Sequence, residues 1–217
     1  MYIKHCKLSK KKQQELMKLF LANTSARMAS KIVNVNRNTG ILFFRKVREV
    51  IDIKMSKNKE KLSGEVEVDE MYYGKRKGSK GRNAKGKKIL FGMKTRGGKV
   101  IIKNIKGVDG KTITQEIYDN IAKNSLIYSD SFRSYNKIDQ EKYEHKTEKH
   151  SKTYVDRKDK TIDTNSIENV WRQVRRYFNV YNGVSKNFKL FLSEVMFRIN
   201  YTDLNVQKKL LNKWSML

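Results

Sequence analysis

The sequence predicts an α/β domain built on a mixed five-stranded β-sheet flanked by helices, preceded by a small all-α domain. Three observations support this prediction. Residues 64–147 contain short apolar runs with the period of two that is typical of strands, whereas residues 8–51 contain apolar residues at helical spacing. One helix-like segment separates the third predicted strand from the fourth, as in a crossover connection. The chain has 217 residues, enough for one substantial core and a small appended domain.

The composition indicates a partner that carries negative charge. The net charge is +27, from 49 Lys and Arg against 22 Asp and Glu. Lysines that replace condensed counterions along a phosphate backbone explain such an excess, so we expect DNA binding. Cys6 is the single cysteine, which excludes an intramolecular disulfide and a cysteine-based zinc site. No stretch approaches the roughly 20 apolar residues of a membrane span, so we expect a cytoplasmic protein with no membrane partner.

The first 51 residues predict three short helices in a helix-turn-helix layout. Ser9 is a candidate N-cap of the first helix. The third helix follows a turn at 34–36. As the last helix of the motif, it is expected to enter the major groove with its first residues at the base edges. Its predicted inward residues are Ile41, Phe44, Val47 and Ile51. Its predicted outward residues are Arg37, Asn38, Arg45 and Arg48.

Three residues at the start of this helix are the candidates for base contacts. Arg37 suits guanine and Asn38 suits adenine, and Thr39 follows them. Arg45 is a further candidate DNA contact on the same helix. A plain three-helix bundle with a solvated basic face is the alternative interpretation.

An acidic strand follows a predicted linker. Residues 52–63 are polar, lysine-rich and weakly periodic, which favours a linker. Two valines then alternate with Glu65, Glu67 and Asp69, so one face of the strand is lined with carboxylates. Hard divalent cations take such oxygen ligands, although an exposed edge strand with an acidic outer face is the alternative.

A basic loop and a hairpin come next. Residues 74–88 mix glycines with many cations, which predicts a flexible loop that closes on the DNA backbone; a solvated hairpin tip is the alternative. The candidate DNA contacts in this loop are Lys75, Arg76, Lys77 and Arg82. Two strands at 89–93 and 100–105 are joined through a Gly-Gly pair, so the first three strands are predicted to form an antiparallel meander.

The second half of the sheet ends on another acid. A helix predicted at 111–123 leads into an apolar strand at 125–130, which ends on Asp130. A strand after a helical crossover is expected to be parallel to its neighbour, and α/β sheets place ligands at the ends of such strands. Asp130 also suits the N-cap of the next turn, and the two roles are compatible. A short last strand is predicted at 144–148.

The clearest helix is predicted at 164–182, where apolar residues recur at steps of three and four. Glu168 lies at the border of this stripe. In one interpretation Glu168 and Arg172 form an ordinary i,i+4 ion pair, worth a few tenths of a kcal/mol. In the other, Glu168 is a third carboxylate that faces the sheet. Helices at 188–199 and 204–214 complete the prediction.

The three acids Asp69, Asp130 and Glu168 fall on the first strand, the fourth strand and a late helix, which is the ribonuclease H-like order. In that arrangement the first and fourth strands are neighbours at the centre of the sheet. Two Mg²⁺ or Mn²⁺ ions held about 3.5 to 4 Å apart by such acids assist in-line phosphoryl transfer. The predicted domains are a helix-turn-helix at 1–51, a linker at 52–63 and a catalytic domain with C-terminal helices at 64–217.

Four motifs support this order, namely Val68–Gly74, Ile127–Asp130, Thr164–Trp171 and Glu194–Asn200. Together they resemble the motifs of bacterial insertion-sequence DDE transposases related to the eukaryotic Merlin elements. The resemblance implies a magnesium-dependent enzyme that cuts element ends to leave a 3′ hydroxyl, then joins that hydroxyl to target DNA. Its implied partners are the terminal inverted repeats, the target DNA and a second copy or more of the chain, acting in the bacterial nucleoid.

The resemblance assigns the site residues by motif. Asp69 and Asp130 match the first two acids. Some relatives have Asn at the third position, so Asn169 and Asn165 compete with Glu168, which we favour because a third carboxylate better balances two divalent cations. A basic residue after the third acid contacts DNA phosphate in related enzymes, and Arg172 or Arg175 matches it.

Two other functions are consistent with the same sequence. The chain lacks the N-terminal Cys-rich zinc module of many relatives. An inactive or domesticated DNA-binding regulator derived from a transposase is therefore one alternative. A metal-dependent nuclease without joining activity is the other.

Overall fold

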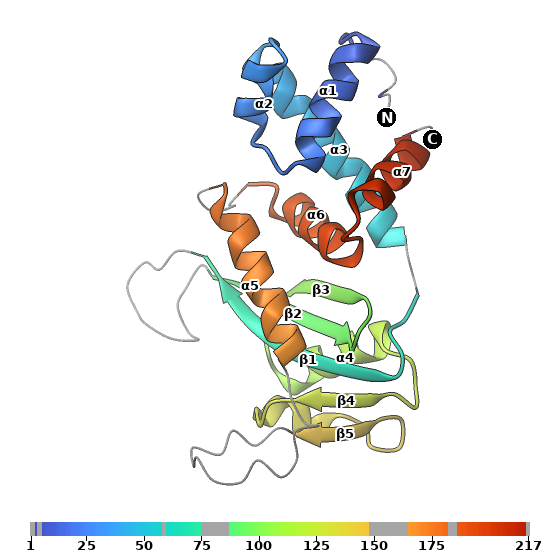
Figure 1. Cartoon of the computed structure of the whole chain (residues 1–217). Helices are drawn as coiled ribbons and strands as arrows, with labels where there is room; N and C mark the ends of the chain where they lie inside the picture. Colours follow the sequence, from blue (N-terminus) through green and yellow to red (C-terminus); the bar gives the residue numbers. More distant parts are fainter. Residues whose placement is uncertain are drawn as a thin grey trace. The chain divides into compact units, whose positions relative to one another are not determined.

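The computed structural model describes residue 3 and residues 6–57, 60–74, 87–147, 165–181 and 186–215. Figure 1 shows the whole chain. It divides into two compact units, one made of residues 1–58 and 177–217, the other of residues 59–176. The first unit is therefore discontinuous in sequence, because the C-terminal helices join the N-terminal ones.

The second unit is built on a mixed five-stranded sheet in the order β3-β2-β1-β4-β5. The strands are β1 (Glu65–Tyr73), β2 (Lys88–Thr95), β3 (Val100–Ile105), β4 (Leu126–Ser129) and β5 (Glu144–Thr147). The pairs β1–β2 and β2–β3 are antiparallel, whereas β4 is parallel to both β1 and β5. This confirms the predicted meander, the parallel fourth strand and the ribonuclease H-like fold.

The two faces of this sheet carry different side chains. Successive residues of a strand point to opposite faces. Val66 and Val68 pack in the core with Ile113 and Ile117 of α4 (Gly110–Asn120). Tyr135, from a 3₁₀ turn at Arg133–Lys137, belongs to the same core. Glu67 and Asp69 of β1 face α5 (Asn165–Asn179), which crosses the other side of the sheet (Figure 1). The alternation seen in the sequence thus separates a core face from a polar face.

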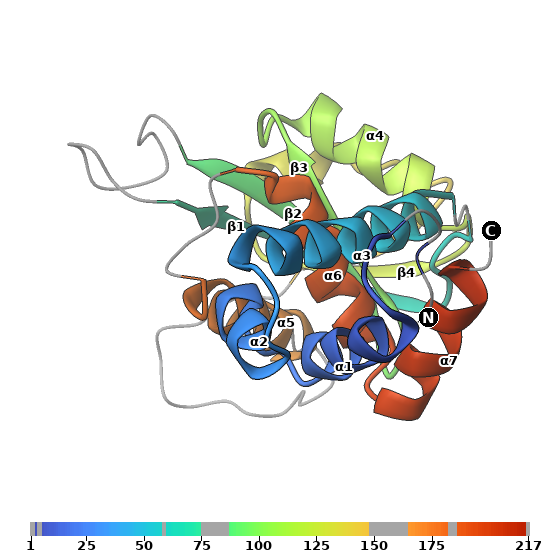
Figure 2. The ribbon, with the colours of Figure 1, turned by 90° about the horizontal axis from the view of Figure 1, so that it is seen from above.

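The first unit contains five helices within the described residues. They are α1 (Lys10–Leu21), α2 (Ala26–Ile32), α3 (Arg37–Lys57), α6 (Phe188–Asn200) and α7 (Leu204–Ser215). Helix α3 packs against both α6 and α7 (Figure 2). Their shared core includes Phe20, Phe44, Phe197 and Leu211. The helices after residue 187 are therefore part of the same hydrophobic core as the predicted helix-turn-helix.

Local signals explain the start and the packing of these helices. Ser9 accepts a hydrogen bond from the backbone N–H of Lys12, which confirms it as the N-cap of α1. Gly40 allows α2 and α3 to approach closely, because a Cβ at this position would lie 2.0 Å from Oγ of Ser30. The absence of a side chain at Gly40 of α3 thus permits this close packing against α2.

The structure corrects three sequence predictions in α3. Residues 52–57 are helical rather than part of a linker, because Asp52 accepts a hydrogen bond from Ser193 Oγ at 2.7 Å and thereby holds the end of α3 to α6. Ile41 is exposed, since Phe43 takes the inward position beside Phe44. Arg48 is buried rather than outward, because a carboxylate on α6 neutralises it.

The predicted basic loop falls mainly outside the described residues. Lys75, Arg76, Lys77 and Arg82 belong to the segment 75–86, which the structure does not describe. Among the helices that are described, none is both long enough and apolar enough to cross a membrane.

Candidate active site

Asp69 lies on β1, on the face of the sheet that α5 covers. It pairs with Gly92 of the neighbouring β2 and is half-buried. Its Oδ2 accepts a hydrogen bond of 2.8 Å from Nε1 of Trp171. Burial raises the pKa of Asp69, the hydrogen bonds from Trp171 and the Glu70 backbone lower it, and the charges of Asp130 and Glu168 raise it again. The charges of the other two predicted acids thus both act on Asp69.

Asp130 follows β4 directly, at the end of the strand next to β1. The parallel register pairs Glu67 with Tyr128, and two residues further along each strand come Asp69 and Asp130. Oδ1 of Asp130 accepts the backbone N–H of Phe132 at 3.0 Å. The N-cap of the following 3₁₀ turn is Phe132 rather than Asp130, so the predicted capping role is wrong, but the bond to the N–H two residues on forms an Asx turn that fixes one oxygen of the carboxylate at the end of the strand.

Glu168 lies in the first turn of α5, and its side chain is exposed. Nη2 of Arg172 lies 3.8 Å from Oε2 of Glu168, and both side chains are largely in water. An exposed pair at this distance contributes little to stability, about 0 to 1 kcal/mol. Asn169, the competing candidate, is also exposed, while the side chain of Asn165 lies outside the described part of the chain. Among the three, Glu168 is the one whose charge acts on Asp69.

The donor set suits a hard divalent cation, because all three groups are carboxylates. Burial, and to a smaller extent the charges of Asp130 and Glu168, raise the pKa of Asp69, and a bound cation would favour its ionised form. Within the described residues, however, no three His, Cys, Asp or Glu side chains already lie close enough to form a metal cage. The residues therefore fit the ions in chemistry and charge, with Glu168 on an exposed side chain that has room to move.

Glu67 anchors the start of α5 over β1, although it is an acid with only 2% of its surface exposed. Oε2 accepts hydrogen bonds from Ser166 Oγ at 2.7 Å and from the backbone N–H of Ile167 at 2.9 Å. Oε1 accepts one from Nε of Arg96 at 3.0 Å. The sequence had indicated Glu67 as a neighbour of Asp69 on the same face. Its contacts make it the residue that fastens the helix carrying Glu168 to the strand carrying Asp69.

The sequence of the chain is similar to a known protein family and to one curated protein. A family profile described as the ISXO2-like transposase domain matches residues 61–200, well over half of the chain. The chain belongs to this family of DDE transposases. An uncharacterized transposase-like protein from Haemophilus influenzae is 27% identical over 110 residues, which cover 50% of this chain and 87% of that protein.

Solved structures of integrases and transposases resemble the transposase chain more distantly. The catalytic core domain of BIV integrase is 14% identical with a TM-score of 0.44, covering 65% of this chain and 86% of the other. A chain of the Mos1 strand transfer complex is 12% identical with a TM-score of 0.31, covering 99% of this chain and 82% of the other. The fold assignment itself rests on the strand order and pairing of the sheet.

Sequence reasoning missed two aromatic residues beside the carboxylates of the transposase domain. The helical periodicity explains Trp171 as one of the apolar residues of α5 and predicts no polar partner for it. Oη of Tyr135, a buried residue, donates a hydrogen bond of 2.8 Å to Oε2 of Glu70. Burial, and then the charges of Glu70, Asp69 and Asp130, raise the pKa of Tyr135 well above its usual value. A buried Trp or Tyr requires a polar partner, and that requirement was the available signal.

A hydrogen-bonded chain supports the backbone at Asp130. Ser129 Oγ donates to the backbone oxygen of Asp130 at 2.8 Å, and it also lies 2.8 Å from Nε2 of His145. Because the Ser129 proton is used in the first bond, Nε2 of His145 is the donor in the second. Burial lowers the pKa of His145. His145 therefore supports β4 from the edge strand β5.

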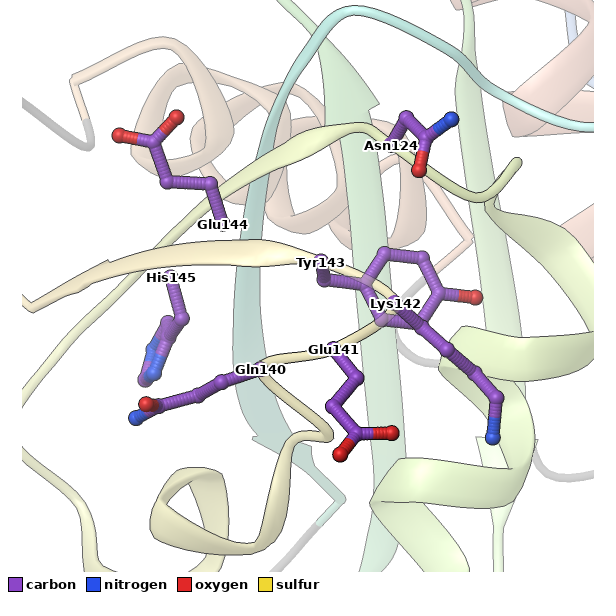
Figure 3. A pocket seen from close by; sticks show the side chains of 7 residues that line it. All are labelled: Asn124, Gln140, Glu141, Lys142, Tyr143, Glu144 and His145. Carbon is purple, nitrogen blue, oxygen red and sulfur yellow. The ribbon is translucent and has the colours of Figure 1, made fainter.

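The same histidine borders an open hollow of about 520 Å³ at the edge of the sheet. Figure 3 shows its lining, with the successive residues Glu144 and His145 pointing to opposite sides of β5. The residues that line it are Asn124, Gln140, Glu141, Lys142, Tyr143, Glu144 and His145. None of the three candidate catalytic acids is among them, so this hollow is separate from the carboxylate site.

The predicted DNA contacts of the first unit lie at the surface of α3. Arg37 and Asn38 are exposed, Thr39 is half-buried, and the backbone N–H of Asn38 is capped by Asn36 Oδ1 at 2.8 Å. Arg37 also borders a hollow of about 450 Å³ together with Arg27 and Lys31 of α2. Three cations from α2 and the start of α3 thus lie around this hollow.

The remaining candidate cations differ in their surroundings. Arg45 is exposed, but its Nε lies 2.9 Å from Oε1 of Glu49 in an i,i+4 pair. Arg175 and Arg172 are exposed on α5, the helix that carries Glu168. The positions of Arg172 and Arg175 are therefore compatible with phosphate contacts beside Glu168.

Proposed function

We propose that this chain is an insertion-sequence transposase that cuts the phosphodiester bonds at the element ends and joins the resulting 3′ hydroxyl to target DNA. Membership of the transposase family supports a polynucleotidyl transferase. The observation that carries the proposal is geometric: Asp69 and Asp130 lie at matching positions of the adjacent parallel strands β1 and β4, and α5, which carries Glu168, is bonded to Asp69 through Trp171. A half-buried carboxylate whose pKa is raised by burial, as that of Asp69 is, is typical of catalytic sites.

In this proposal Asp69, Asp130 and Glu168 hold two Mg²⁺ or Mn²⁺ ions. Such ions, when bound, supply Lewis-acid activation of the attacking oxygen and neutralise charge on the leaving oxygen. The protein contributes orientation: Trp171 fixes one oxygen of Asp69, and the turn after β4 fixes one oxygen of Asp130. In cleavage, a water oxygen forms a bond to phosphorus while the bond to the 3′ oxygen breaks. In joining, the freed 3′ hydroxyl attacks a phosphodiester of the target DNA, whose own 3′ oxygen leaves.

The DNA is held in this proposal by cations of both units. Arg37, Asn38 and Thr39 read the terminal inverted repeats, with Arg45 on the backbone. Arg172 and Arg175 hold phosphate near the carboxylates, and the loop cations Lys75, Arg76, Lys77 and Arg82 close on the DNA. The functional division into a helix-turn-helix at 1–51 and a catalytic domain from residue 64 belongs to the same proposal. Bringing two ends together requires a dimer or a larger assembly, acting on DNA in the bacterial cytoplasm. The four motifs of the sequence support a further grouping with the Merlin elements.

The experiment uses purified full-length protein and an oligonucleotide duplex that carries the inverted repeat flanking the gene. We expect Mg²⁺-dependent cleavage that leaves a 3′ hydroxyl, and joining of pre-cut ends to plasmid DNA. Asp130→Asn is expected to bind the duplex as well as the wild type but to cut and join none of it. Binding without cleavage by the wild type would instead indicate a regulator, and cleavage without joining would indicate a nuclease.

A further inference from the structure

The indole of Trp171 occupies the space above a glycine on the strand next to Asp69. Gly92 is the antiparallel partner of Asp69, so the two residues lie side by side in the sheet. A Cβ at position 92 would lie 2.6 Å from two carbon atoms of the Trp171 ring. Contacts this short do not occur, so the ring can lie here only because residue 92 has no side chain. Gly92 is therefore part of the arrangement that brings Trp171 to Asp69.

The polar end of the same indole has one partner that defines its role. Trp171 is 3% exposed, and a buried indole N–H requires an acceptor. That acceptor is Oδ2 of Asp69, at 2.8 Å. The backbone of Glu70 also bonds to the Asp69 carboxylate, and the indole is its side-chain donor. The indole thus restricts the rotation of the carboxylate about its χ2 angle.

A second contact keeps α5 in register with β1. Ile167, four residues before Trp171, donates its backbone N–H to Glu67, two residues before Asp69. Four residues of helix rise about 6 Å, and two residues of strand rise about 6.6 Å. The two contacts therefore match in spacing, and Glu168 lies on the helix between them. Together they fix the position of the third acid with respect to the first.

We propose that Trp171, seated on Gly92, is a positioning residue that sets the orientation of the Asp69 carboxylate for the divalent ions of the proposed transposase reaction. The inference rests on the proposed function, since it takes Asp69 as a metal ligand. Groups that orient ligands from behind typically change metal affinity or activity by about 10- to 100-fold when they are removed. Trp171 acts on the reaction only through Asp69.

Mn²⁺ binding to the full-length protein, followed by electron paramagnetic resonance in the absence of DNA, tests this role without an activity assay. Trp171→Phe keeps an aromatic ring over Gly92 and removes the N–H donor. We expect its Mn²⁺ affinity to fall by about 10- to 100-fold. Trp214→Phe is the matched control, because Trp214 is the other tryptophan of the chain and lies on α7, and its Mn²⁺ affinity is expected to equal that of the wild type.

Gly92→Ala supplies a second, independent variant that retains the donor but displaces the ring. It is also expected to weaken Mn²⁺ binding. Thermal unfolding shows whether Trp171→Phe folds, and Gly92→Ala tests the same role if it does not. Unchanged Mn²⁺ affinity in a folded Trp171→Phe or Gly92→Ala protein overturns the positioning role. Asp69→Asn separates this failure from that of the proposed function. If Asp69→Asn loses Mn²⁺ binding while Trp171→Phe keeps it, only the positioning role fails; if Asp69→Asn binds Mn²⁺ like the wild type, the metal site itself is wrong.

Discussion

Two acids, the half-buried Asp69 in the second unit and the fully buried Glu194 in the first, differ in the groups that surround their carboxylates. Glu194 is fully buried, and two arginines neutralise it: Nε of Arg48 lies 2.5 Å from Oε2, and Nη2 of Arg198 lies 2.7 Å from Oε1. Asp69 accepts a hydrogen bond from Trp171, and burial, followed by the charges of Asp130 and Glu168, raises its pKa. One acid serves stability, while the other has the strained electrostatics expected of a catalytic group.

The surroundings of Glu194 show what a compensated buried charge does for a fold. Arg48 on α3 also lies over the ring of Phe191 at 4.1 Å from its centroid. Arg198 donates to the backbone oxygens of Phe20 and Leu21 at the end of α1. A single carboxylate on α6 thus joins three helices of the first unit, and it belongs to the fourth motif found in the sequence.

The largest effect that would test the contrast is expected for Asp69→Asn. Loss of a metal ligand removes several kcal/mol of transition-state stabilisation, so cleavage of element-end DNA should fall on the order of a thousandfold or more. In the metal-free protein at neutral pH, the same change should raise the melting temperature, because it removes an ionised carboxylate that burial and its acidic neighbours disfavour.

The sign of the stability effect follows from the raised pKa of Asp69. The folded state disfavours ionisation, so the ionised group destabilises the fold once the pH exceeds the ordinary value of 3.8. The stability difference between Asp69→Asn and the wild type should therefore shrink as the pH falls from the raised folded-state pKa toward 3.8, and vanish below 3.8. A lower melting temperature for Asp69→Asn at pH 7 would show that the site is not electrostatically strained.

Glu194→Gln should have the opposite outcome. It leaves Arg48 and Arg198 buried without their counter-charge, and breaking a buried pair in this way typically costs about 3 to 5 kcal/mol. Urea unfolding measures this cost. Glu49→Gln is the matched control, since Glu49 forms an exposed i,i+4 pair with Arg45 and should change stability by no more than about 0.5 kcal/mol. Equal effects of the two variants would contradict a structural role for Glu194.

The smallest expected effect concerns His145. Burial lowers its pKa in the folded state below the ordinary 6.5, so the unfolded chain binds a proton at a higher pH than the folded one. This group therefore contributes a loss of stability as the pH falls through about 6.5. His145→Gln keeps a donor for Ser129 and should show a shallower decrease in melting temperature between pH 7.5 and 5.5 than the wild type. Parallel curves for the two proteins would exclude this contribution.

The sequence was informative where a feature repeats locally. The period of two in β1, the four-residue spacing of isoleucines in α4 and the stripe of α5 predicted the elements, and their order predicted the sheet. The features that it missed depend on partners far away in the chain. Trp171 bonds to a residue 102 positions earlier, and Arg48 to one 146 positions later. The local sequence around Asp52 predicts a linker, and only the hydrogen bond from the distant Ser193 explains why this segment is helical.

The most direct test of the central claim is a change of metal preference at Asp69. In a Cys6→Ser background, Asp69→Cys replaces a hard carboxylate by a thiolate, which binds Mg²⁺ poorly and accepts Mn²⁺ more readily. The wild type is expected to cut element-end DNA with either metal. The cysteine variant should be inactive with Mg²⁺ and regain cleavage with Mn²⁺ at the same DNA ends. Equal cleavage by the cysteine variant in the two metals would contradict the assignment of Asp69 as a metal ligand.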